Sequence, residues 1–376
     1  MMNMVLQRHL AYVINTNSLS TFSKKVSLAL TFLLVVGCSH IQYPEVTASY
    51  ETAPVVTAGD AADDAAIWVN QSNPSQSMVL GTDKKSGVYS YDLAGVTIGY
   101  TKLGKINNID LRTQQGQTYI FGSNRTTQTV DLWIYKEEEI AKSVANMDFK
   151  LSEDRFYQGQ SAINIYGICA GFDKELGLIA FITEDEGPRV EVWQYMDNSL
   201  QLIHTFDNGG ESEGCVYDDE NRRLLISEEE VNGVLRAYNV SAELDFSNPV
   251  VIDSRQGHIG GDPEGVTLYK TSNSDGYIIL SSQGDSKFNL YERNSPFKYI
   301  GSFRVGDKTF VDETVIDGVS ITDGIAAVNV NLNQDFRKGL LVVQDNDNFD
   351  EDDKYNQNFK FVSFDKVLKL IPMMNP

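Results

Sequence analysis

The sequence is short of basic residues, and this shortage argues against one class of partner. Only 31 lysines and arginines stand against 52 aspartates and glutamates, which gives a net charge of −21. Nucleic acid requires basic patches that match its phosphates, so we expect no nucleic-acid partner. An acidic protein can still bind a polyanion if metal cations lie between the two. Apolar residues make up 41% of the chain, enough for a substantial hydrophobic core.

Cysteine is also scarce, with three residues at Cys38, Cys169 and Cys215. The last two have no zinc-ligand spacing, and neither begins a Cys-x5-Arg phosphatase loop. We interpret Cys169 and Cys215 as buried structural thiols. A disulfide between neighbouring strands is the alternative in an oxidising compartment.

The N-terminus lacks an apolar run long enough for a comfortable transmembrane helix. Residues 26–36 are apolar, follow Lys24 and Lys25, and have the length of a signal-peptide core. Residues 35–38, Val-Val-Gly-Cys, resemble a bacterial lipobox. We therefore predict a signal peptide over 1–37, membrane attachment through a lipidated Cys38, and a linker or N-terminal tail over 38–56. An ordinary secretory signal is the alternative; either way the protein is expected to be secreted, periplasmic or an outer-membrane lipoprotein.

One pattern occurs six times along the rest of the chain: an apolar strand, small polar residues, a turn, and a strand that ends in an aromatic residue. The six copies are 78–91, 119–135, 178–195, 224–238, 277–291 and 340–364. A further strand is expected before each copy, at 65–69, 109–112, 167–172, 214–217, 265–269 and 324–328. Propeller blades take about 40–50 residues each, with excess length in loops. Two separate sandwiches would not give six phased copies, so we predict an all-β, six-bladed β-propeller over residues 57–376.

Acidic and amide residues precede the first strand of most predicted blades, and Tyr166 occupies this place in the third. They are Asp63, Asp64, Asn107, Asn108, Asp110, Glu213, Asp262, Glu264 and Asp323. Equivalent positions of successive blades surround one mouth of the central channel. A dry ring of carboxylates would repel itself at neutral pH, whereas carboxylates and carbonyls are the ligands that calcium prefers. The ring therefore predicts several calcium ions, and solvated turn residues are the alternative.

Three cations, Lys84, Lys85 and Arg125, lie among these acids in the sequence. Successive side chains of a strand point to opposite faces, so Lys84 and Lys85 could serve two anion subsites. Arg125 offers a bidentate fork for a phosphate. A pair of ordinary surface lysines is the alternative.

The chain resembles the β-propeller phytases. Nine stretches carry the resemblance, in family order: 59–69, 81–87, 107–112, 123–125, 166–167, 213–220, 262–265, 281–284 and 317–324. The resemblance implies an enzyme that hydrolyses the phosphate monoesters of myo-inositol hexakisphosphate (phytate) by attack of a calcium-activated water. We expect a monomer, and we expect phytate to be taken as its calcium complex because the acidic chain should repel the bare polyanion.

The resemblance also implies roles for individual residues. Lys84, Arg125 and Tyr166 would hold the phosphate that is cleaved, and Lys85 a neighbouring phosphate. Catalytic calcium ions would be bound by Asp64, Glu213, Glu229, Glu264 and Asp323. Further calcium or polar contacts would come from Asp60, Asn107, Asn108, Asp110, Asp262, Gln283 and Asp317.

The chain departs from the family's pattern at three places. The family often has a lysine in the third-blade turn, which reads Thr183-Glu184-Asp185-Glu186-Gly187 here, and Arg189 is the nearby cation that could bind substrate instead. Ala65 stands where a proline is usual, and Ile321 where an aspartate is often found. We expect weaker substrate affinity, a local backbone change and one altered calcium site.

The chemistry itself supports a calcium enzyme. Uncatalysed hydrolysis of phosphate monoesters is very slow, and their loose transition state needs positioning and charge neutralisation. The four histidines occur in no Arg-His-Gly motif, which argues against a histidine acid phosphatase. A calcium propeller lactonase or esterase and a calcium-stabilised surface binding propeller without catalysis are the alternatives.

Overall fold

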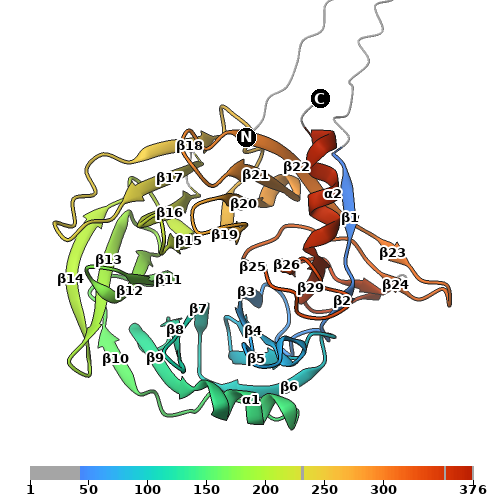
Figure 1. Cartoon of the computed structure of the whole chain (residues 1–376), viewed down its shortest axis with the longest axis horizontal. Coiled ribbons are helices and arrows are strands. Elements are labelled where there is room, and N and C mark those ends of the chain that lie inside the picture. Colours follow the sequence, from blue (N-terminus) through green and yellow to red (C-terminus); the bar gives the residue numbers. More distant parts are fainter. Residues whose placement is uncertain (1–42, 230–232, 351–352, 375–376) are drawn as a thin grey trace, which may run out of the picture. The chain divides into compact units, whose positions relative to one another are not determined.

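Six β-sheets form a ring in the computed structural model, which describes residues 43–229, 233–350 and 353–374 (Figure 1). The first three blades consist of β3 (Ala62–Trp68), β4 (Met78–Asp83), β5 (Gly87–Tyr91) and β6 (Thr97–Lys102); β7 (Ile106–Gln114), β8 (Gln117–Asn124), β9 (Thr129–Lys136) and β10 (Tyr157–Gln160); and β11 (Ile165–Asp173), β12 (Gly177–Glu184), β13 (Arg189–Met196) and β14 (Ser199–Asp207). The last three consist of β15 (Ser212–Asp218), β16 (Arg223–Glu228), β17 (Val234–Asn239) and β18 (Val250–Ser254); β19 (Pro263–Lys270), β20 (Gly276–Ser282), β21 (Lys287–Glu292) and β22 (Tyr299–Gly306); and β25 (Ile325–Val328), β26 (Leu340–Asp345) and β29 (Asn358–Ser363) with an N-terminal strand. The predicted six-bladed, all-β propeller is confirmed.

The first strand of every blade lies nearest the centre of the ring, where Figure 1 places β3, β7, β11, β15, β19 and β25. Each of these strands contains most of one predicted inner strand. Within each of the first five blades the four strands named above pair in chain order, each antiparallel to the next. All six inner strands therefore begin at the same mouth of the channel.

Hydrophobic contacts between neighbouring blades hold the ring together. The described residues form six buried clusters, and each combines side chains of two adjacent blades. Trp68 of the first blade and Trp133 of the second, both fully buried, share one of them. Full burial of one large apolar side chain stabilises a fold by about 1.5–3 kcal/mol. Because these contacts run from sheet to sheet around the ring, each blade buries its apolar side chains against the blades on both sides of it.

Part of the segment expected as a linker or tail is joined to the propeller. Strand β1 (Glu45–Thr47) pairs parallel to β22 as a fifth strand of the fifth blade. Strand β2 (Tyr50–Glu51) pairs antiparallel to β29 and supplies the outer strand of the sixth blade. The sixth blade thus combines the N-terminal and C-terminal parts of the described chain, which closes the ring. The signal-peptide and lipidation predictions fall on residues 1–42, outside the described residues.

Two α-helices of the described residues lie outside the blades. Helix α1 (Glu137–Ala145) connects β9 and β10. Its first turn contains three glutamates, whose negative charges stabilise the helix because they lie at the positive end of its dipole. Helix α2 (Phe364–Met374) follows β29, so Phe364 begins a helix and does not end a strand as the repeat predicts. Neither helix is long and apolar enough to cross a membrane.

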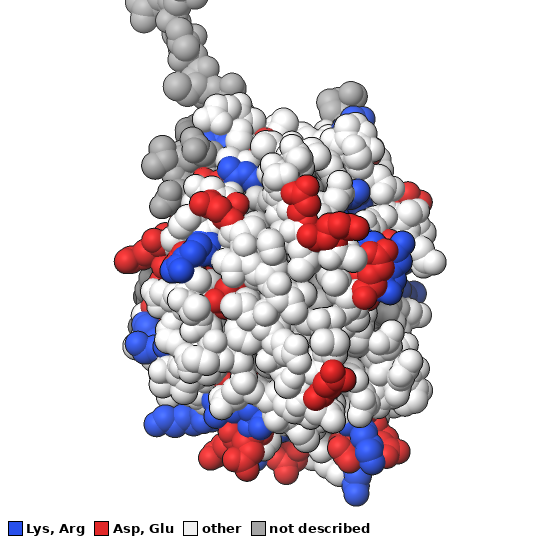
Figure 2. Space-filling view, turned by 90° about the vertical axis from the view of Figure 1, so that its left-hand side faces the viewer, with Lys and Arg blue, Asp and Glu red and all other residues white. Residues whose placement is uncertain are grey.

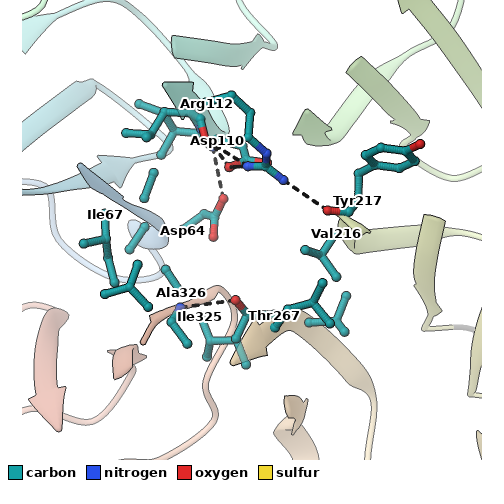
Figure 3. Close-up of a pocket in the computed structure, with 18 of the residues that line it drawn as sticks. Asp64, Ile67, Asp110, Arg112, Val216, Tyr217, Thr267, Ile325 and Ala326 are labelled. Carbon is teal, nitrogen blue, oxygen red and sulfur yellow. Dashed lines mark hydrogen bonds and ion pairs between the residues drawn. The ribbon is translucent and has the colours of Figure 1, made fainter. Parts of the chain in front are cut away.

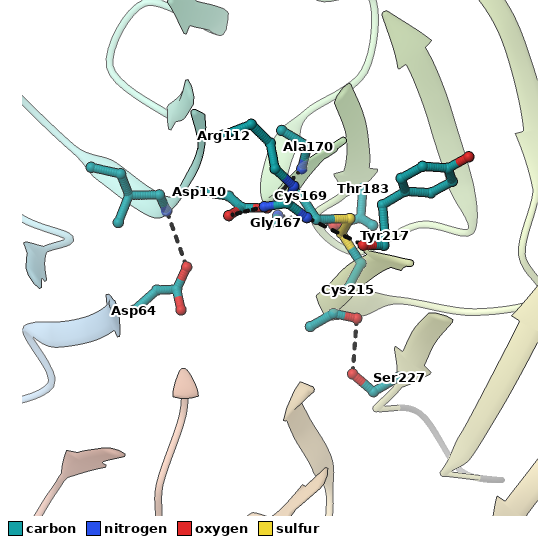
Figure 4. The surroundings of a disulfide bond; sticks show 12 residues. Asp64, Asp110, Arg112, Gly167, Cys169, Ala170, Thr183, Cys215, Tyr217 and Ser227 are labelled. Carbon is teal, nitrogen blue, oxygen red and sulfur yellow. Dashed lines mark hydrogen bonds and ion pairs between the residues drawn. A yellow bond between two sulfur atoms is a disulfide. The ribbon is translucent and has the colours of Figure 1, made fainter. Parts of the chain in front are cut away.

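Cys169 and Cys215 form a disulfide bond, so our interpretation of them as free thiols is wrong and the alternative is correct. Cys169 lies in β11 and Cys215 in β15, the inner strands of the third and fourth blades. Figure 4 shows the bond beside the channel, with Arg112 and Asp110 near it. The sequence could not decide between the two states because Cys169 stands two residues after Gly167 and Cys215 only one residue after Gly214, so the repeat does not show that their side chains meet.

The charged side chains of the outer wall are mixed in sign. Figure 2 shows acidic and basic residues side by side near its upper and lower margins, with a broad uncharged area between them. Among the described residues on this face, no continuous basic patch is visible.

Candidate active site

The side chains at the channel mouth come from β-bulges at the starts of the inner strands. In blades one to five, pairing with the second strand shifts register at the head of the inner strand. The bulged pairs are Asp63–Asp64, Asn107–Asn108, Tyr166–Gly167, Glu213–Gly214 and Glu264–Gly265. A bulge adds one residue and redirects its side chain, which is why bulges are frequent at functional sites. The repeated bulge therefore aims one functional side chain per blade into the mouth.

Glycine is required at two of these bulges by the approach of the next blade. A Cβ at Gly167 would overlap the carbonyl oxygen of Glu213, and a Cβ at Gly214 would overlap that of Glu264. Because glycine has no Cβ, the bulges of successive blades can pack against each other at these positions. This close packing brings the functional side chains beside these glycines together.

A second set of mouth residues follows the second strand of each blade. In the first five blades the residue that follows the second strand donates its backbone N–H to the carbonyl directly before the inner strand, and in the sixth blade the corresponding N–H donates to Ser320, a few residues before β25. The residues are Lys84, Arg125, Asp185, Glu229, Gln283 and Asn346. The same main-chain contact therefore fixes six different side chains at equivalent places around the mouth.

Three glutamates meet at the centre of the mouth. Carboxylate oxygens of Glu213, Glu229 and Glu264 all lie within 4.8 Å of one another. Glu229 Oε1 and Glu264 Oε2 are buried without a hydrogen-bond partner among the described residues. A cluster of three carboxylates that contains two buried, unpartnered oxygens fits a hard cation such as calcium, which would supply the missing contact.

The protonation of these acids reflects their burial. Burial raises the pKa of Glu213 to about 7 and that of Glu229 to about 8. Burial, with the charges of Glu229 and Glu213, raises the pKa of Glu264 well above its ordinary value. Burial also raises the pKa of Asp323 to about 7. The metal-free cluster therefore holds protons near neutral pH, and a cation would displace them.

Lys84 lies among acids of the first and sixth blades. Its Nζ is 2.9 Å from Asp60 Oδ1, 2.8 Å from Asp63 Oδ1 and 3.3 Å from Asp323 Oδ2. Burial opposes the lysine's charge, but Asp63 and Asp323 outweigh it, so the pKa of Lys84 is raised. Gln283 Nε2 donates to Asp323 Oδ1 at 2.7 Å and holds that carboxylate from the other side.

Arg125 lies between the second and third blades. Its Nη1 donates to Asn107 Oδ1 at 3.0 Å, and its Nη2 to Asp185 Oδ2 at 2.7 Å. Its guanidinium carbon lies 5.2 Å from the centroid of the Tyr166 ring. Burial, together with the carboxylates of Glu213, Glu229 and Glu264, raises the pKa of Tyr166. Tyr166 is therefore neutral near pH 7 and can donate its hydroxyl proton to an anion.

Lys85 and Arg189 lie away from this cluster. Lys84 and Lys85 both come after the end of β4, so the alternation of side chains along a strand, on which we based the two-subsite prediction, does not apply to them. The two lysines nevertheless contact different groups. Lys85 is exposed, and its Nζ donates to the carbonyl of Ala58 at 3.1 Å. Arg189 is half exposed and forms an ion pair with Glu184.

Several predicted metal ligands make other contacts. Asp262 pairs with Arg255, and Asp317 with Lys360. Asp110 pairs with Arg112 at 2.9 Å.

Asp64 and Asp110 line a cavity of about 450 Å³ in the channel (Figure 3). Asp64 Oδ2 accepts the backbone N–H of Ile109 at 3.0 Å. At the first bulge it is thus Asp63, and not the predicted ligand Asp64, that contacts Lys84. The pair of aspartates in the sequence signals this position, but only the bulge decides which of them faces the cations.

The fold and the mouth together define a six-bladed propeller with a carboxylate cluster beside two cations and a tyrosine. A family model described as Phytase matches residues 15–374 of this chain. The chain is also 31% identical over 337 residues to a 3-phytase of Bacillus subtilis (strain 168), covering 86% of this chain and 84% of that protein. Among solved structures, a chain of the "Crystal Structure of Mitotic Checkpoint Complex" is similar with a TM-score of 0.47 and 9% identity, covering 86% of this chain and 97% of that one.

The family model and the Bacillus relative cover most of the sequence. The chain therefore belongs to the phytase family, a family of phosphoric monoester hydrolases.

Proposed function

We propose that this enzyme removes phosphate from phytate with the help of calcium bound at the mouth of the propeller. The observation that carries this proposal is the glutamate cluster of Glu213, Glu229 and Glu264, whose buried oxygens converge without enough partners. Lys84, Arg125 and Tyr166 lie around the same mouth and supply donors for an anion. Membership of the phytase family supports phytate as the substrate.

The residues of the chain have distinct tasks in this proposal. Calcium bound by the glutamates would neutralise phosphate charge and make a water molecule more acidic. Arg125 and Lys84 hold the phosphate oxygens through charge-assisted hydrogen bonds. Tyr166 donates from its neutral hydroxyl, and its ring supports the Arg125 guanidinium. These groups are fixed before substrate arrives, so little reorganisation opposes the reaction.

The charge of the chain bears on the form of the substrate. A protein with a net charge of −21 repels a bare polyanion at long range. Phytate as its calcium complex carries less negative charge and brings cations to the acidic mouth. Exposed Lys85, on the first-blade side, is available for a neighbouring phosphate.

Phosphate release from phytate, measured with calcium and with excess chelator, tests the proposal. We expect release with calcium and almost none with chelator. Calcium-dependent binding of phytate without release would indicate a non-catalytic binding propeller. Hydrolysis of lactones or carboxylic esters in place of phytate would indicate the other enzyme class.

We also propose that the mature protein begins at Cys38 and is held at a membrane by lipid on that cysteine. The apolar run and the lipobox-like residues 35–38 support this. Expression of the full chain and of a Cys38→Ser variant, followed by fractionation, tests it. We expect only the variant to appear in the soluble fraction.

A further inference from the structure

The third-blade turn carries an anion at a place where two other blades carry cations. Asp185 follows β12 just as Lys84 follows β4 and Arg125 follows β8, and all three backbone N–H groups make the equivalent bond. The fold therefore presents these three side chains at matching positions around the mouth. Two of them attract a phosphate, and the third repels one.

Asp185 is held in place by its surroundings. Its Oδ2 accepts from Arg125 Nη2 at 2.7 Å and from Asn164 Nδ2 at 2.8 Å. Its backbone N–H donates to the Asn164 carbonyl at 2.8 Å. The Asp185 side chain is only 19% exposed. Its negative charge therefore stays beside the Arg125 guanidinium.

The nearest cation in the same turn does not compensate for this charge. Arg189 is paired with Glu184 through its Nε and Nη2 atoms. Glu186 adds a further exposed acid, and its backbone N–H donates to Glu211 at 3.1 Å. The third-blade side of the mouth is thus acidic throughout its described turn, whereas the first-blade side carries Lys84 and Lys85.

We propose that Asp185 is a specificity-determining residue that limits how much substrate charge the mouth accepts beside Arg125. This inference rests on the proposed function, in which Arg125 holds a substrate phosphate. A single phosphate binds the N–H groups of the Arg125 guanidinium that do not already donate to Asn107 or Asp185. An adjacent phosphate on the third-blade side meets the Asp185 carboxylate and is repelled. Asp185 therefore selects substrates or substrate orientations whose additional phosphates lie towards Lys85.

The test compares Asp185→Asn with the wild type on phytate and on phenyl phosphate at one fixed free calcium concentration. Asparagine keeps the size of the side chain and an oxygen for Arg125 and Asn164. We expect kcat/KM for phytate to rise about fivefold, the upper end for one partly exposed charge pair, through a lower KM. For phenyl phosphate we expect a change below twofold, since it has no second phosphate. Glu186→Gln, which removes a charge from the same turn, is the matched control and should change neither substrate by more than about twofold.

An equal loss of kcat on both substrates would overturn the proposal, because Asp185 would then only orient Arg125. Unchanged KM for phytate would overturn it as well. Calorimetric binding of myo-inositol hexasulfate, a non-hydrolysed analogue, separates this inference from the proposed function. If the wild type neither hydrolyses phytate nor binds the analogue, the proposed function fails. If the wild type does both and Asp185→Asn binds the analogue no more tightly, only the role of Asp185 is refuted.

Discussion

The side-chain amide of Asn107 reaches across the mouth from the second blade to the fourth, where its Nδ2 lies 2.7 Å from Glu213 Oε1. Its Oδ1 accepts from Arg125 at 3.0 Å. One buried amide therefore links the carboxylate cluster to the anion-binding arginine. An amide can do this because it donates and accepts through different atoms.

Asn107→Ala should lower kcat/KM on phytate about 10- to 100-fold, the range for losing hydrogen bonds to charged groups. Both Arg125 and Glu213 lose an orienting contact, so calcium affinity should fall too. Steady-state kinetics and calcium titration measure the two effects. Asn294→Ala is the control, since it removes a side-chain amide that donates to Asp275 and not to a residue of the mouth. This variant should leave kcat/KM and calcium affinity unchanged. Wild-type kinetics in Asn107→Ala would contradict the linking role.

Glu264→Gln should have opposite effects on activity and on metal-free stability. The change removes one ligand charge, so calcium affinity should fall by at least about 100-fold and turnover should be lost at limiting calcium. In chelator, the variant should unfold at a higher temperature than the wild type, because buried Glu264 must take up a proton on folding whereas glutamine is already neutral. Thermal unfolding with and without calcium tests this, with Glu292→Gln as an exposed control. A lower melting temperature in chelator would show that the charge of Glu264 stabilises the metal-free fold.

Calcium binding should weaken as the pH falls from 8 to 6. Burial raises the pKa of Glu213 and of Asp323 to about 7 and that of Glu229 to about 8, so the ion must displace protons in this range. In chelator the stability of the fold should change with pH in the opposite direction, increasing as the pH falls. Carboxyl groups whose pKa is raised in the folded state contribute stability that is complete below their unfolded pKa and lost as the pH rises through 7 to 8. Unfolding in chelator at pH 6 and 8 should show the greater stability at pH 6; the opposite order would contradict it.

Replacing the disulfide by Cys169→Ala with Cys215→Ala should lower the free energy of unfolding by about 2–4 kcal/mol. The bond closes a loop of sequence separation 46 between two neighbouring blades, so its loss frees the unfolded chain. Urea unfolding at fixed calcium provides the measurement. Wild-type protein unfolded with a reductant should lose a similar amount, and stability that does not respond to either treatment would refute the contribution of the bond.

Ile321→Asn should stabilise the protein by about 1 kcal/mol. Ile321 is a β-branched residue with a φ of 43° and a side chain that is 40% exposed, so its strain has little burial to offset it. Asparagine tolerates this left-handed conformation far better. Unfolding in chelator isolates the backbone effect from calcium binding. Val251→Asn, which removes an exposed apolar side chain from strand β18, should give no comparable gain. Equal gains would show that stability rises because an exposed apolar side chain is removed and not because backbone strain is relieved.

The sequence alone was sufficient to predict the ring of six blades and the gathering of acidic residues at one mouth of its channel. The six phased copies predict the blades because each strand must bury one face against the next sheet, and that constraint is local and periodic. Placing Glu213 and Glu264 at one mouth follows from the same repeat, since equivalent residues of a ring lie at equivalent heights. Phe364 marks the limit of this argument, because the last copy of the pattern ends in a helix.

Only the tertiary structure decided what each of these residues contacts. The bulge at Asp63–Asp64 adds one residue, and a change of one residue in a strand moves every side chain to the opposite face; strand periodicity cannot predict which aspartate meets Lys84. The ion pair of Arg125 with Asp185 and the bond of Cys169 with Cys215 join residues 60 and 46 positions apart. Such contacts depend on how neighbouring blades are set in height and angle, and that is determined by packing between the sheets.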